Sequence, residues 1–472
     1  MPYNRRMTDT AIQQDADLAI IGGGAAGVMT ALQALRHATQ PLRVLLFEPA
    51  SALGQGIAYA TPWPEHLLNV PAARMSALPA EPGDFVDYLM QAGAFAVEDR
   101  AAVGARFVPR HYFATYLQQR LAEAMDAGPA TLQVVPQAVL AMQRDDDALC
   151  LRLADGGRRR ARQVVLATGN NVRSMPVPGA DVLALDRVAE AWDYEGVRLL
   201  AGERAVGIVG SGLSMVDSVL GLLHAGQTGA IHVYSRHGLM PLPHAHGQAA
   251  SYDPQPLLAM TLRQRLRALR RHAREAAAAG IPWQSVMERI RPLGQALWQS
   301  LGAADQRRFL RHVVRQWDTH RHRIDAGVHA RLQAALQSGQ LQVHRARLHG
   351  VVEADGALQL SGMVRGKAGH WPLGALVNAT GLETGSTGLR NPLLRQLLAQ
   401  GMARPGPHGL GLDVAVHDAR LCDAEGNPHA DIAVLGSLRI GSLWETIAVP
   451  ELRQQAEYAA CHAVRERQAA MP

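Results

Sequence analysis

The chain has 472 residues with a formal charge of +6, 48% hydrophobic residues and 19% charged residues, a composition typical of a globular protein. Its length exceeds that of one ordinary hydrophobic core, so we expect two or three domains. Few aromatic residues (5%) and no dense basic block argue against a nucleic-acid-binding protein, and three scattered cysteines without a C-x-x-C pair argue against a dithiol redox centre and for a reducing cytoplasm.

Membrane-spanning and metal-binding proteins are also disfavoured. Glycines interrupt the apolar segment 18–35, no signal-peptide cleavage site follows it, and no other apolar run of 18 residues occurs. We therefore expect no membrane span and no secretion signal. His244 and His246 form an H-x-H pair without further acidic or cysteine ligands nearby, so we expect no metal site.

The first predicted unit is a β-α-β arrangement. Residues 17–21 form an apolar strand, residues 25–37 a helix, and residues 42–47 a second strand that ends at Glu48. The connection between the first strand and the helix reads Gly22-Gly23-Gly24-Ala25-Ala26-Gly27. Glu48 follows Gly22 by 26 positions, close to the spacing of roughly 20 that dinucleotide-binding units show.

A loop-rich stretch and a group of strands follow. Residues 54–82 are expected to be mostly loops, and a helix is expected at 117–125. Strands are expected at 132–135, 139–144, 150–153 and 164–169, the last of which ends in Ala-Thr-Gly.

A second unit repeats this order. A strand at 205–209, a glycine-rich turn, a helix at 213–224 and a strand at 231–234 lead later to strands at 341–344 and 375–381. The last of these again ends in Ala-Thr-Gly. The sequence therefore contains a divergent internal repeat and predicts an α/β fold with two Rossmann-like dinucleotide-binding domains, small antiparallel sheets and a helical insert.

The insert lies at residues 255–330, where helical periodicity predicts three or four helices. A strand at 431–436 and a helix at 450–465 close the chain. We expect residues 1–178 and 375–472 to form an FAD-binding domain, and residues 179–254 and 331–374 to form an NAD(P)H-binding domain.

The first glycine-rich turn has the features of a site for a dinucleotide diphosphate. Gly22 permits the sharp bend, Gly24 lets the backbone approach the diphosphate, and Gly27 lets the helix pack on the strand. The first helical amides, which include that of Ala26, would face the diphosphate, and Glu48 would accept hydrogen bonds from the adenosine ribose. We assign tightly held FAD to this turn; the alternative is a purely structural glycine-rich turn.

The second turn differs in ways that favour NADPH. Its glycines are Gly210 and Gly212, its helix opens at Leu213, and Met215 replaces the third glycine, which predicts a looser or shifted helix. The strand after the helix ends in Ser235-Arg236 instead of an acid. A carboxylate would repel a 2′-phosphate, whereas these two side chains can bind one. The alternative is that Arg236 is a solvated surface residue and that either nicotinamide nucleotide is used.

Other residues are expected at the cofactors because of their place in the repeat. A helix beginning near Gly441 would direct its N-terminus at the flavin pyrimidine. Val139 would offer backbone groups to the adenine, although an apolar residue there also suits a core, and Trp444 suits either packing or ring contact. The remaining predicted cofactor residues are Thr168, Gly169, Thr380, Gly381, Gly436 and Glu445.

Several motifs carry a family resemblance over residues 17–460. They are Gly54–Tyr59, Leu68–Ala72, Gly210–Asp217, Ser235–Gly238, Trp444-Glu445 and Val449–Leu452. With them the chain resembles the bacterial FAD/NAD(P)-binding family of flavoproteins related to flavin-dependent N-monooxygenases, which includes oxygenases that convert aspartate to nitrosuccinate. The resemblance implies FAD at the first turn, NAD(P)H at the second, and a flavin region lined by Gln55, Gly56, Tyr59 and Asn69.

The activity implied by this resemblance is that of an NADPH-consuming monooxygenase. NADPH would reduce the flavin, and the reduced flavin would react with dioxygen to a C4a-hydroperoxide that N-oxygenates a small amino acid or amine, an aspartate-like substrate included. The alternative is a non-oxygenating NAD(P)H-dependent flavin oxidoreductase that acts on a small molecule or redox partner. A third reading is a flavin-binding sensor or scaffold.

The substrate is expected to contact the helical insert. Its densest polar cluster is residues 317–323, and a carboxylate-bearing substrate would need arginines. We expect Arg291, Arg321, His322 and Arg323 to act there together with Asn69. The alternative is that these arginines are salt-bridged or exposed helix residues.

Overall fold

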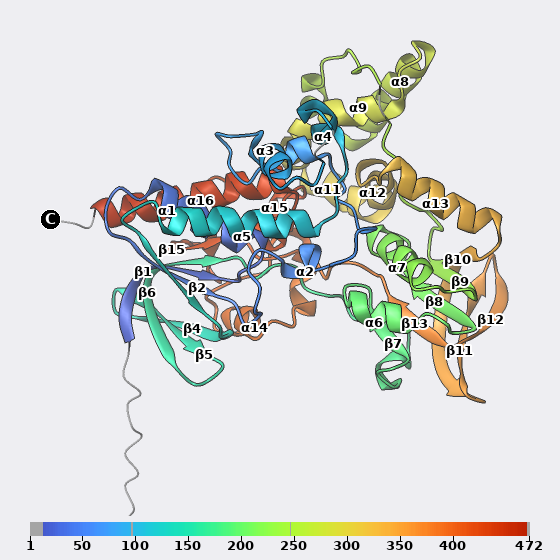
Figure 1. Cartoon of the computed structure of the whole chain (residues 1–472), viewed down its shortest axis with the longest axis horizontal. Coiled ribbons are helices and arrows are strands. Elements are labelled where there is room, and N and C mark those ends of the chain that lie inside the picture. The colour runs from blue at the N-terminus through green and yellow to red at the C-terminus, as the bar shows by residue number, and fades with distance from the viewer. Residues whose placement is uncertain (1–12, 96–97, 246, 470–472) are drawn as a thin grey trace, which may run out of the picture.

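Two mixed β-sheets and a separate group of helices make up the protein in the computed structural model, which describes residues 13–95, 98–245 and 247–469 (Figure 1). This confirms the predicted α/β class with two dinucleotide-binding units. In Figure 1 the two sheets lie side by side along the long axis, and the inserted helices lie above them. Among the described helices, none combines the length and the apolar character that crossing a membrane requires.

The first sheet has eight strands, and its order is β14-β15-β6-β1-β2-β3, with the β4–β5 hairpin attached through β6. The strands from β15 to β3 are parallel, so a strand from the end of the chain completes the N-terminal sheet. The strands are β1 (Gln13–Ile21), β2 (Arg43–Phe47), β3 (Thr131–Val135), β4 (Val139–Asp145), β5 (Ala148–Leu153), β6 (Arg158–Leu166), β14 (Arg420–Cys422) and β15 (Pro428–Val434).

Helices cover one face of this sheet. These are α1 (Ala25–His37), α5 (His111–Met125) and α16 (Val449–Ala469), which Figure 1 shows running along the same side. The hairpin of β4 and β5 and helix α14 (Pro392–Ala399) cover the other face. Because the central strands of a parallel sheet are buried on both sides, β1 and β6 end in apolar runs without alternation, at residues 18–21 and 164–166.

The second sheet has the order β12-β11-β10-β9-β8-β13-β7. Helices α6 (Tyr194–Leu199), α7 (Leu213–His224) and α13 (Ala326–Gln337) pack on one face, and β11 and β12 fold over the other. The strands are β7 (Val188–Glu190), β8 (Ala205–Val209), β9 (Ala230–Ser235), β10 (Leu341–Ala354), β11 (Ala357–Val364), β12 (Lys367–Leu373) and β13 (Ala375–Asn378).

Two expected boundaries differ from the sheet pairing. We placed residues 375–472 in the first unit, but β13 pairs in parallel with β8 and β7 of the second sheet. We also extended the insert to residue 330, but α13 begins at Ala326 and buries Val328 and Leu332 in the core of the second unit. Apolar periodicity predicts that a segment has a buried face, but it does not indicate which core receives that face.

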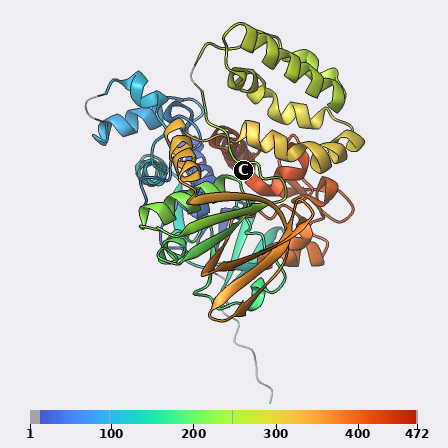
Figure 2. The ribbon, with the colours of Figure 1, turned by 90° about the vertical axis from the view of Figure 1, so that its right-hand side faces the viewer.

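The insert contains more helices than the three or four predicted. The structure describes all of residues 255–323 and places five α-helices there, because Gly280, Pro282, Pro292 and Gly302 interrupt the helical stretch. The helices are α8 (Leu262–Ala278), α9 (Trp283–Ile290), α10 (Gly294–Gln299), α11 (Ala303–Arg308) and α12 (Val314–Arg321). A π-helical turn, Phe309–Val313, joins the last two. Figure 2 shows the insert standing apart from both sheets.

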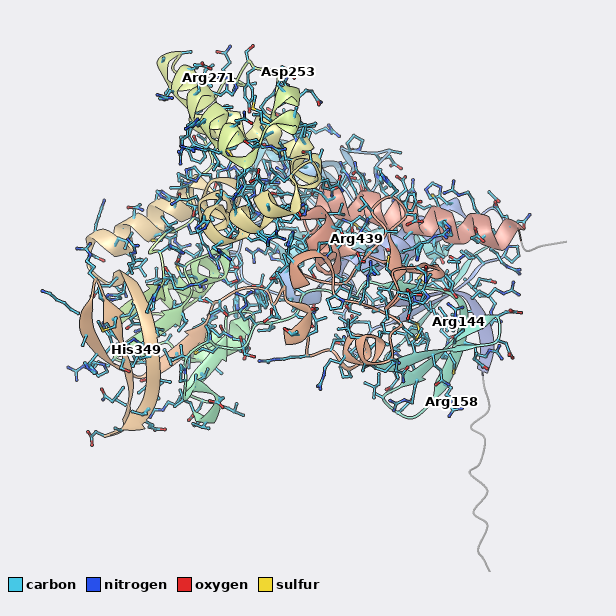
Figure 3. All side chains as sticks on the ribbon, turned by 180° about the vertical axis from the view of Figure 1, so that it is seen from behind. Arg144, Arg158, Asp253, Arg271, His349 and Arg439 are labelled. Atoms are coloured by element: carbon cyan, nitrogen blue, oxygen red, sulfur yellow. The ribbon has the colours of Figure 1, made fainter. Side chains whose placement is uncertain are left out.

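The insert carries the positive charge of the molecule. Residues 255–323 contain 14 arginines and four acidic residues, a net charge of +10, whereas the rest of the chain has 33 basic and 37 acidic residues, a net charge of −4. Five exposed arginines belong to α8 alone: Arg263, Arg267, Arg270, Arg271 and Arg274. Figure 3 shows Arg271 at the outer end of the insert, on the opposite side of the molecule from Arg144 and Arg158 of the first sheet.

Other helices were not predicted. They are α2 (Gly56–Tyr59), α3 (Asp84–Gln91), α4 (Arg100–Ala105), α6 and α14. The expected start of a helix near Gly441 corresponds to α15 (Ile440–Leu443), which is four residues long, and the long final helix begins at Val449.

Candidate functional site

The first glycine-rich turn is built so that two positions accept only glycine. Gly22 has φ 109°, and a Cβ atom there would overlap the carbonyl oxygen of Ala167, the first residue of the Ala-Thr-Gly segment. A Cβ atom on Gly27 would overlap the carbonyl oxygen of Gly22. The helix therefore packs against the turn, and the turn against the end of β6, as the predicted roles of Gly22 and Gly27 require.

The N-terminus of α1 is open to a ligand. Its N-cap, Gly24, has no side chain to occupy the first helical amides, so these donors and the positive end of the helix dipole are available. A Cβ atom on Gly24 would lie 3.4 Å from the Gly56 Cα atom, so two glycine backbones face each other here. Ala26 is half-buried on the same first turn of the helix.

Glu48 lies at this turn and is held by the backbone. Its Oε2 atom accepts a hydrogen bond from the Gly23 amide at 2.7 Å, and its Oε1 atom accepts one from the Ala50 amide at 3.0 Å. Ionised carboxylates accept further hydrogen bonds, so an adenosine ribose can bind to the same group. The turn, the helix N-terminus and Glu48 thus fit the diphosphate and ribose of FAD.

Further residues predicted at the flavin lie in loops around this turn. Gln55 and Gly56 begin α2, and the Tyr59 ring packs against Phe113 with ring centroids 4.8 Å apart. Burial raises the pKa of Tyr59 to about 12, against an opposing effect of the Arg110 charge. Thr168 has a buried Oγ1 atom without a hydrogen-bond partner among the described residues, a polar group that a ligand can satisfy. Gly169, with φ 72°, follows it in open space.

The second turn repeats the backbone arrangement of the first. Gly210 has φ 112°, and a Cβ atom there would overlap the carbonyl oxygen of Ala379, the alanine of the second Ala-Thr-Gly segment. Gly212 is the N-cap of α7, again without a side-chain cap, and faces open space. Met215 is fully buried in the core of the second unit, so α7 lacks the close contact that Gly27 gives α1.

Several residues predicted at the second nucleotide contact other parts of the protein. Leu213 is half-buried and lines a small cavity with Asn69 between the two units. Thr380 Oγ1 donates a hydrogen bond to Asn378 Oδ1 at 2.7 Å, unlike Thr168 in the first unit. The Gly381 carbonyl accepts a hydrogen bond from the Arg173 amide at 3.4 Å.

Positive charge gathers at the end of β9. Ser235 Oγ lies 2.9 Å from Ser211 Oγ and accepts a hydrogen bond from the Gly238 amide at 2.9 Å, which shapes the loop. Arg236 is exposed and has no hydrogen bond or ion pair with any described residue.

Sequence reasoning missed a second arginine at this loop. Arg345 lies directly opposite Ser235 on the parallel strand β10 and likewise has no partner in the described chain. Partial burial and the charges of Arg236, Arg315 and Arg345 lower the pKa of His237 between them. Pairing the predicted strand at 341–344 with the strand at 231–234 would have placed Arg345 here.

The junction between the insert and the C-terminal part of the first unit centres on Trp444 and Glu445. Trp444 has φ 61° and ψ −65°, and the Glu445 amide donates to the Leu443 carbonyl at 2.8 Å, which defines a strained γ-turn. The Trp444 ring stacks on Trp298 of α10 at 5.2 Å and meets Phe309 edge-on at 5.3 Å. In the structure Trp444 therefore packs against the insert.

Glu445 is 9% exposed and is bound by three groups of the insert. Arg321 Nη2 lies 3.1 Å from its Oε2 atom, and Trp317 Nε1 donates to its Oε1 atom at 3.2 Å. Gln295 Nε2 donates to its backbone carbonyl at 2.8 Å. Glu445 thus anchors α10 and α12 to the first unit.

A second carboxylate, that of the half-buried Glu288, interacts with three arginines. Arg74 of the first unit donates to it at 2.6 Å, Arg323 pairs with it, and Arg291 lies 3.9 Å away. Burial acts to raise the pKa of Glu288, but the hydrogen bond from Arg74 and the three positive charges outweigh it and lower that pKa to about 2.

The four predicted substrate residues of the insert have different surroundings. Arg321 and Arg323 are committed to Glu445 and Glu288, as the salt-bridged alternative predicted. The His322 side chain is 42% exposed beside Asp318. Arg291 is different, because its side chain is 10% exposed, yet its buried Nη2 atom has no hydrogen-bond partner in the described part of the chain.

Burial, together with the charges of Arg321 and Arg74, lowers the pKa of Arg291 to about 10. A guanidinium at that value stays protonated at neutral pH, so Arg291 is a buried cation whose Nη1 atom has a long ion pair with Glu288 and whose Nη2 atom has no partner among the described residues. An anionic ligand group would satisfy it.

Three other predicted residues lie in different settings. Val139, the first residue of β4, is 5% exposed and packs in the core of the first unit, as the alternative of a core residue predicted. Gly436, with φ 69°, donates its amide to Gln455 Oε1 at 3.0 Å and accepts from Thr446 Oγ1 at 3.0 Å. Asn69 accepts a hydrogen bond at its backbone carbonyl from His244 Nε2 at 3.1 Å.

His246 of the H-x-H pair lies outside the described residues. His244 is bound to Asn69, and the part of the chain that the structure describes contains no group of three or more potential ligands arranged for a metal ion.

Comparisons with known proteins agree with this geometry. A family model described as FAD-NAD(P)-binding matches residues 19–171, whereas no curated protein sequence matches the chain. Among solved structures, ornithine hydroxylase from Pseudomonas aeruginosa has a TM-score of 0.65 at 18% identity, over 96% of this chain and 100% of that one. L-lysine 6-monooxygenase from Pseudomonas syringae has a TM-score of 0.67 at 17% identity, over 97% and 100%. Bacillithiol disulfide reductase from Staphylococcus aureus has a TM-score of 0.57 at 13% identity, over 98% and 100%.

Proposed function

We propose, from the FAD-NAD(P)-binding family model that matches residues 19–171, that the protein is an FAD-dependent, NADPH-consuming monooxygenase that N-oxygenates a small amine bearing a carboxylate. The alternative is an NAD(P)H-dependent flavin oxidoreductase that does not transfer oxygen. Two dinucleotide turns with the same backbone arrangement support the pairing of a flavin with a nicotinamide nucleotide.

The observation that carries the substrate class is Arg291. A buried guanidinium whose Nη2 atom has no partner is costly, and a substrate carboxylate would remove that cost by a charge-assisted hydrogen bond. Arg291 lies on the insert at its junction with the first unit, beside Glu288. Substrate specificity therefore depends on the insert, as the sequence pattern predicts.

Different residues bind the two cofactors and shield the substrate. The amides at the start of α1 and Glu48 hold the FAD, while α7 with Ser235, Arg236 and Arg345 holds NADPH through its 2′-phosphate. Bound FAD supplies the electron transfer and the activation of dioxygen. The aromatic cluster of Trp298, Phe309 and Trp444 excludes water from the junction at which the substrate binds.

Structural similarity and the cysteines favour the monooxygenase over disulfide reduction. The neighbours named as hydroxylase and monooxygenase act on ornithine and lysine, and they superpose with higher TM-scores than the disulfide reductase does. Cys150, Cys422 and Cys461 are free thiols on three different elements of the described chain, so no adjacent pair offers a dithiol.

The test is a screen of amines and amino acids with the purified FAD-loaded protein and NADPH. We expect one carboxylate-bearing amine to stimulate NADPH consumption and to give a product heavier by oxygen, measured by mass spectrometry. NADPH oxidation that bleaches the flavin but yields only hydrogen peroxide with every amine would indicate the non-oxygenating reductase. Failure of NADPH to reduce the flavin would contradict both enzyme readings.

A further inference from the structure

Two charged side chains at the junction of the insert and the first unit each have one buried atom without a hydrogen-bond partner among the described residues. One is Arg291, at the end of α9, whose Nη2 atom is unpartnered. The other is Glu451, in the first turn of α16, whose Oε2 atom is buried and unpartnered among the described residues. A buried carboxylate oxygen without a donor costs free energy, so this second group also calls for a ligand.

The contact at Glu445 brings the two elements together. Gly294, three residues after Arg291, packs so closely on Glu445 that a Cβ atom there would lie 2.9 Å from its Cγ atom. Gln295 bonds the Glu445 carbonyl, and Glu451 follows Glu445 by six positions. The charges of Arg291 and Glu451 act on each other, yet no ion pair within 4 Å joins them in the described structure.

The other acids and bases at this junction are already engaged. Glu445 is bound by Arg321 and Trp317, and Glu288 by Arg74 and Arg323. His244 is hydrogen-bonded to the Asn69 carbonyl. Glu451 therefore differs from its neighbours in having an oxygen atom that no described residue uses.

We propose that Glu451 binds the amino group of the substrate and accepts a proton from it, opposite a carboxylate held by Arg291. This inference rests on the proposed N-oxygenation, because an ammonium nitrogen has no lone pair with which to react. The N–H bond of the ammonium breaks, an O–H bond forms at Glu451 Oε2, and the electron pair of the broken bond stays on nitrogen. No oxidant or further reactant enters this step.

The electrostatics around Glu451 suit proton acceptance. Burial raises the pKa of Glu451 and the nearby Glu445 charge adds to this effect, while a hydrogen bond from its own backbone amide and the charges of Arg291 and Arg321 act to lower that pKa. A carboxylate with a raised pKa is a stronger base than an ordinary one and comes closer to the amine in proton affinity. In contrast, the pKa of Glu288 is lowered to about 2, which makes that carboxylate a poor base.

The test measures binding to the oxidised FAD-loaded protein, without turnover. The probes are amino acids, each paired with the acid that lacks the amino group: aspartate with succinate, glutamate with glutarate, and alanine with propionate. We expect Glu451→Gln to weaken binding of the preferred amino acid about 10-fold or more and to leave binding of its partner acid unchanged. Arg291→Gln should weaken both members of the pair.

A second readout follows proton transfer. In Glu451→Gln, the turnover number with the amino acid should rise with pH as the free amine becomes available in solution, and Glu451→Asp should restore part of the wild-type profile at neutral pH. Glu466→Gln, on the exposed end of the same helix, is the matched control and should match the wild type. Flavin content and urea unfolding verify that each variant is folded.

Several outcomes would overturn the inference. One is that Glu451→Gln weakens binding of the amino acid and of its partner acid equally, and another is that it binds the amino acid as tightly as the wild type does. A third is that the wild type binds none of the probes below about 10 mM. If Glu451→Gln does not fold, Glu451→Asp takes its place, and an unchanged preference for the amino acid over its partner acid in that variant counts against the inference. Selective binding without any oxygenated product would contradict the proposed function and leave the binding role of Glu451 standing. If the wild type forms the oxygenated product and Glu451→Gln binds and oxygenates the amino acid equally well, this inference alone is contradicted.

Discussion

Arg321 of the insert lies 3.1 Å from Glu445 of the first unit, and the two side chains are 8% and 9% exposed. Removing one member of such a pair leaves a buried charge without compensation, which costs about 3–5 kcal/mol. We therefore expect Arg321→Ala to lower the free energy of unfolding by about 3 kcal/mol, measured by urea denaturation. The control is Arg308→Ala, which removes the exposed pair with Asp305 and should cost less than about 1 kcal/mol. Equal effects of the two variants would contradict a role for Glu445 as an anchor.

The two glycine turns can be separated by one substitution in each. Gly22→Ala and Gly210→Ala place a methyl group on a carbonyl oxygen, at Ala167 and Ala379 respectively. We expect Gly22→Ala to purify without flavin, measured by visible absorbance. We expect Gly210→Ala to keep its flavin but to be reduced by NADPH at least ~100-fold more slowly, about 2.7 kcal/mol in the barrier.

A matched control for these variants is Gly202→Ala. Gly202 has φ 99°, but a Cβ atom there meets no other atom within 4 Å, so this variant tests backbone strain alone. It should keep both flavin and NADPH reduction. Loss of flavin from Gly210→Ala instead of Gly22→Ala would reverse the assignment of the two turns.

The end of β9 should determine the preference for NADPH. Arg236→Ala and Arg345→Ala each remove one cation that could bind a 2′-phosphate, and a hydrogen bond to a charged group is worth about 1.5–3 kcal/mol. We expect each to lower kcat/KM for NADPH by about 10-fold or more and to leave that for NADH unchanged. Arg347→Ala, two residues further along β10, is the control. A strong NADH preference in the wild type that survives Arg236→Ala would contradict the assignment.

His244 should make stability depend on pH. Burial, aided by the Arg323 charge, lowers the pKa of His244 from its ordinary 6.5 to about 4 in the folded protein. Below pH 6.5 the unfolded chain binds a proton at this residue that the folded chain does not, so the free energy of unfolding falls from pH 6.5 to pH 4 and then levels off.

His244→Gln can keep the hydrogen bond to the Asn69 carbonyl but does not titrate. Relative to the wild type it should therefore gain of the order of 2 kcal/mol in stability between pH 7 and pH 4, after allowance for solvent screening. Urea unfolding at several pH values measures this, with the exposed His349→Gln as control. Parallel curves for wild type and His244→Gln would show that His244 does not take part in the dependence.

Short sequence patterns predicted those helices whose ends and buried faces depend on neighbouring residues. The expected helices at 25–37 and 213–224 have the bounds of α1 and α7, because a glycine N-cap and an apolar face define each of them. The pairing of β13 with β8 and the packing of α13 were not predictable in this way, since both depend on which distant core receives an apolar segment.

The same distinction between local and distant contacts applies to the candidate site. The turn glycines and Glu48 belong to one short segment with known spacing, so the sequence alone indicated them. Arg291, Arg321 and Arg323 look alike in sequence, and only their partners Glu288 and Glu445 distinguish them. Arg345 is more than 100 positions from Ser235, and Glu451 is more than 100 positions from Arg291, so no local motif connects the members of either pair.

The uneven charge of the molecule acts at long range. With a net charge of +10 on the insert and −4 on the remainder, the protein is an electric dipole whose positive end is the insert. Such a field steers anions toward one side of a molecule and raises their association rates, an effect that weakens steeply as salt is added. The proposed ligands, NADPH and a carboxylate-bearing substrate, are both anions, so we expect the field to guide each of them toward the insert and the ionic strength of the medium to change the rate at which they bind.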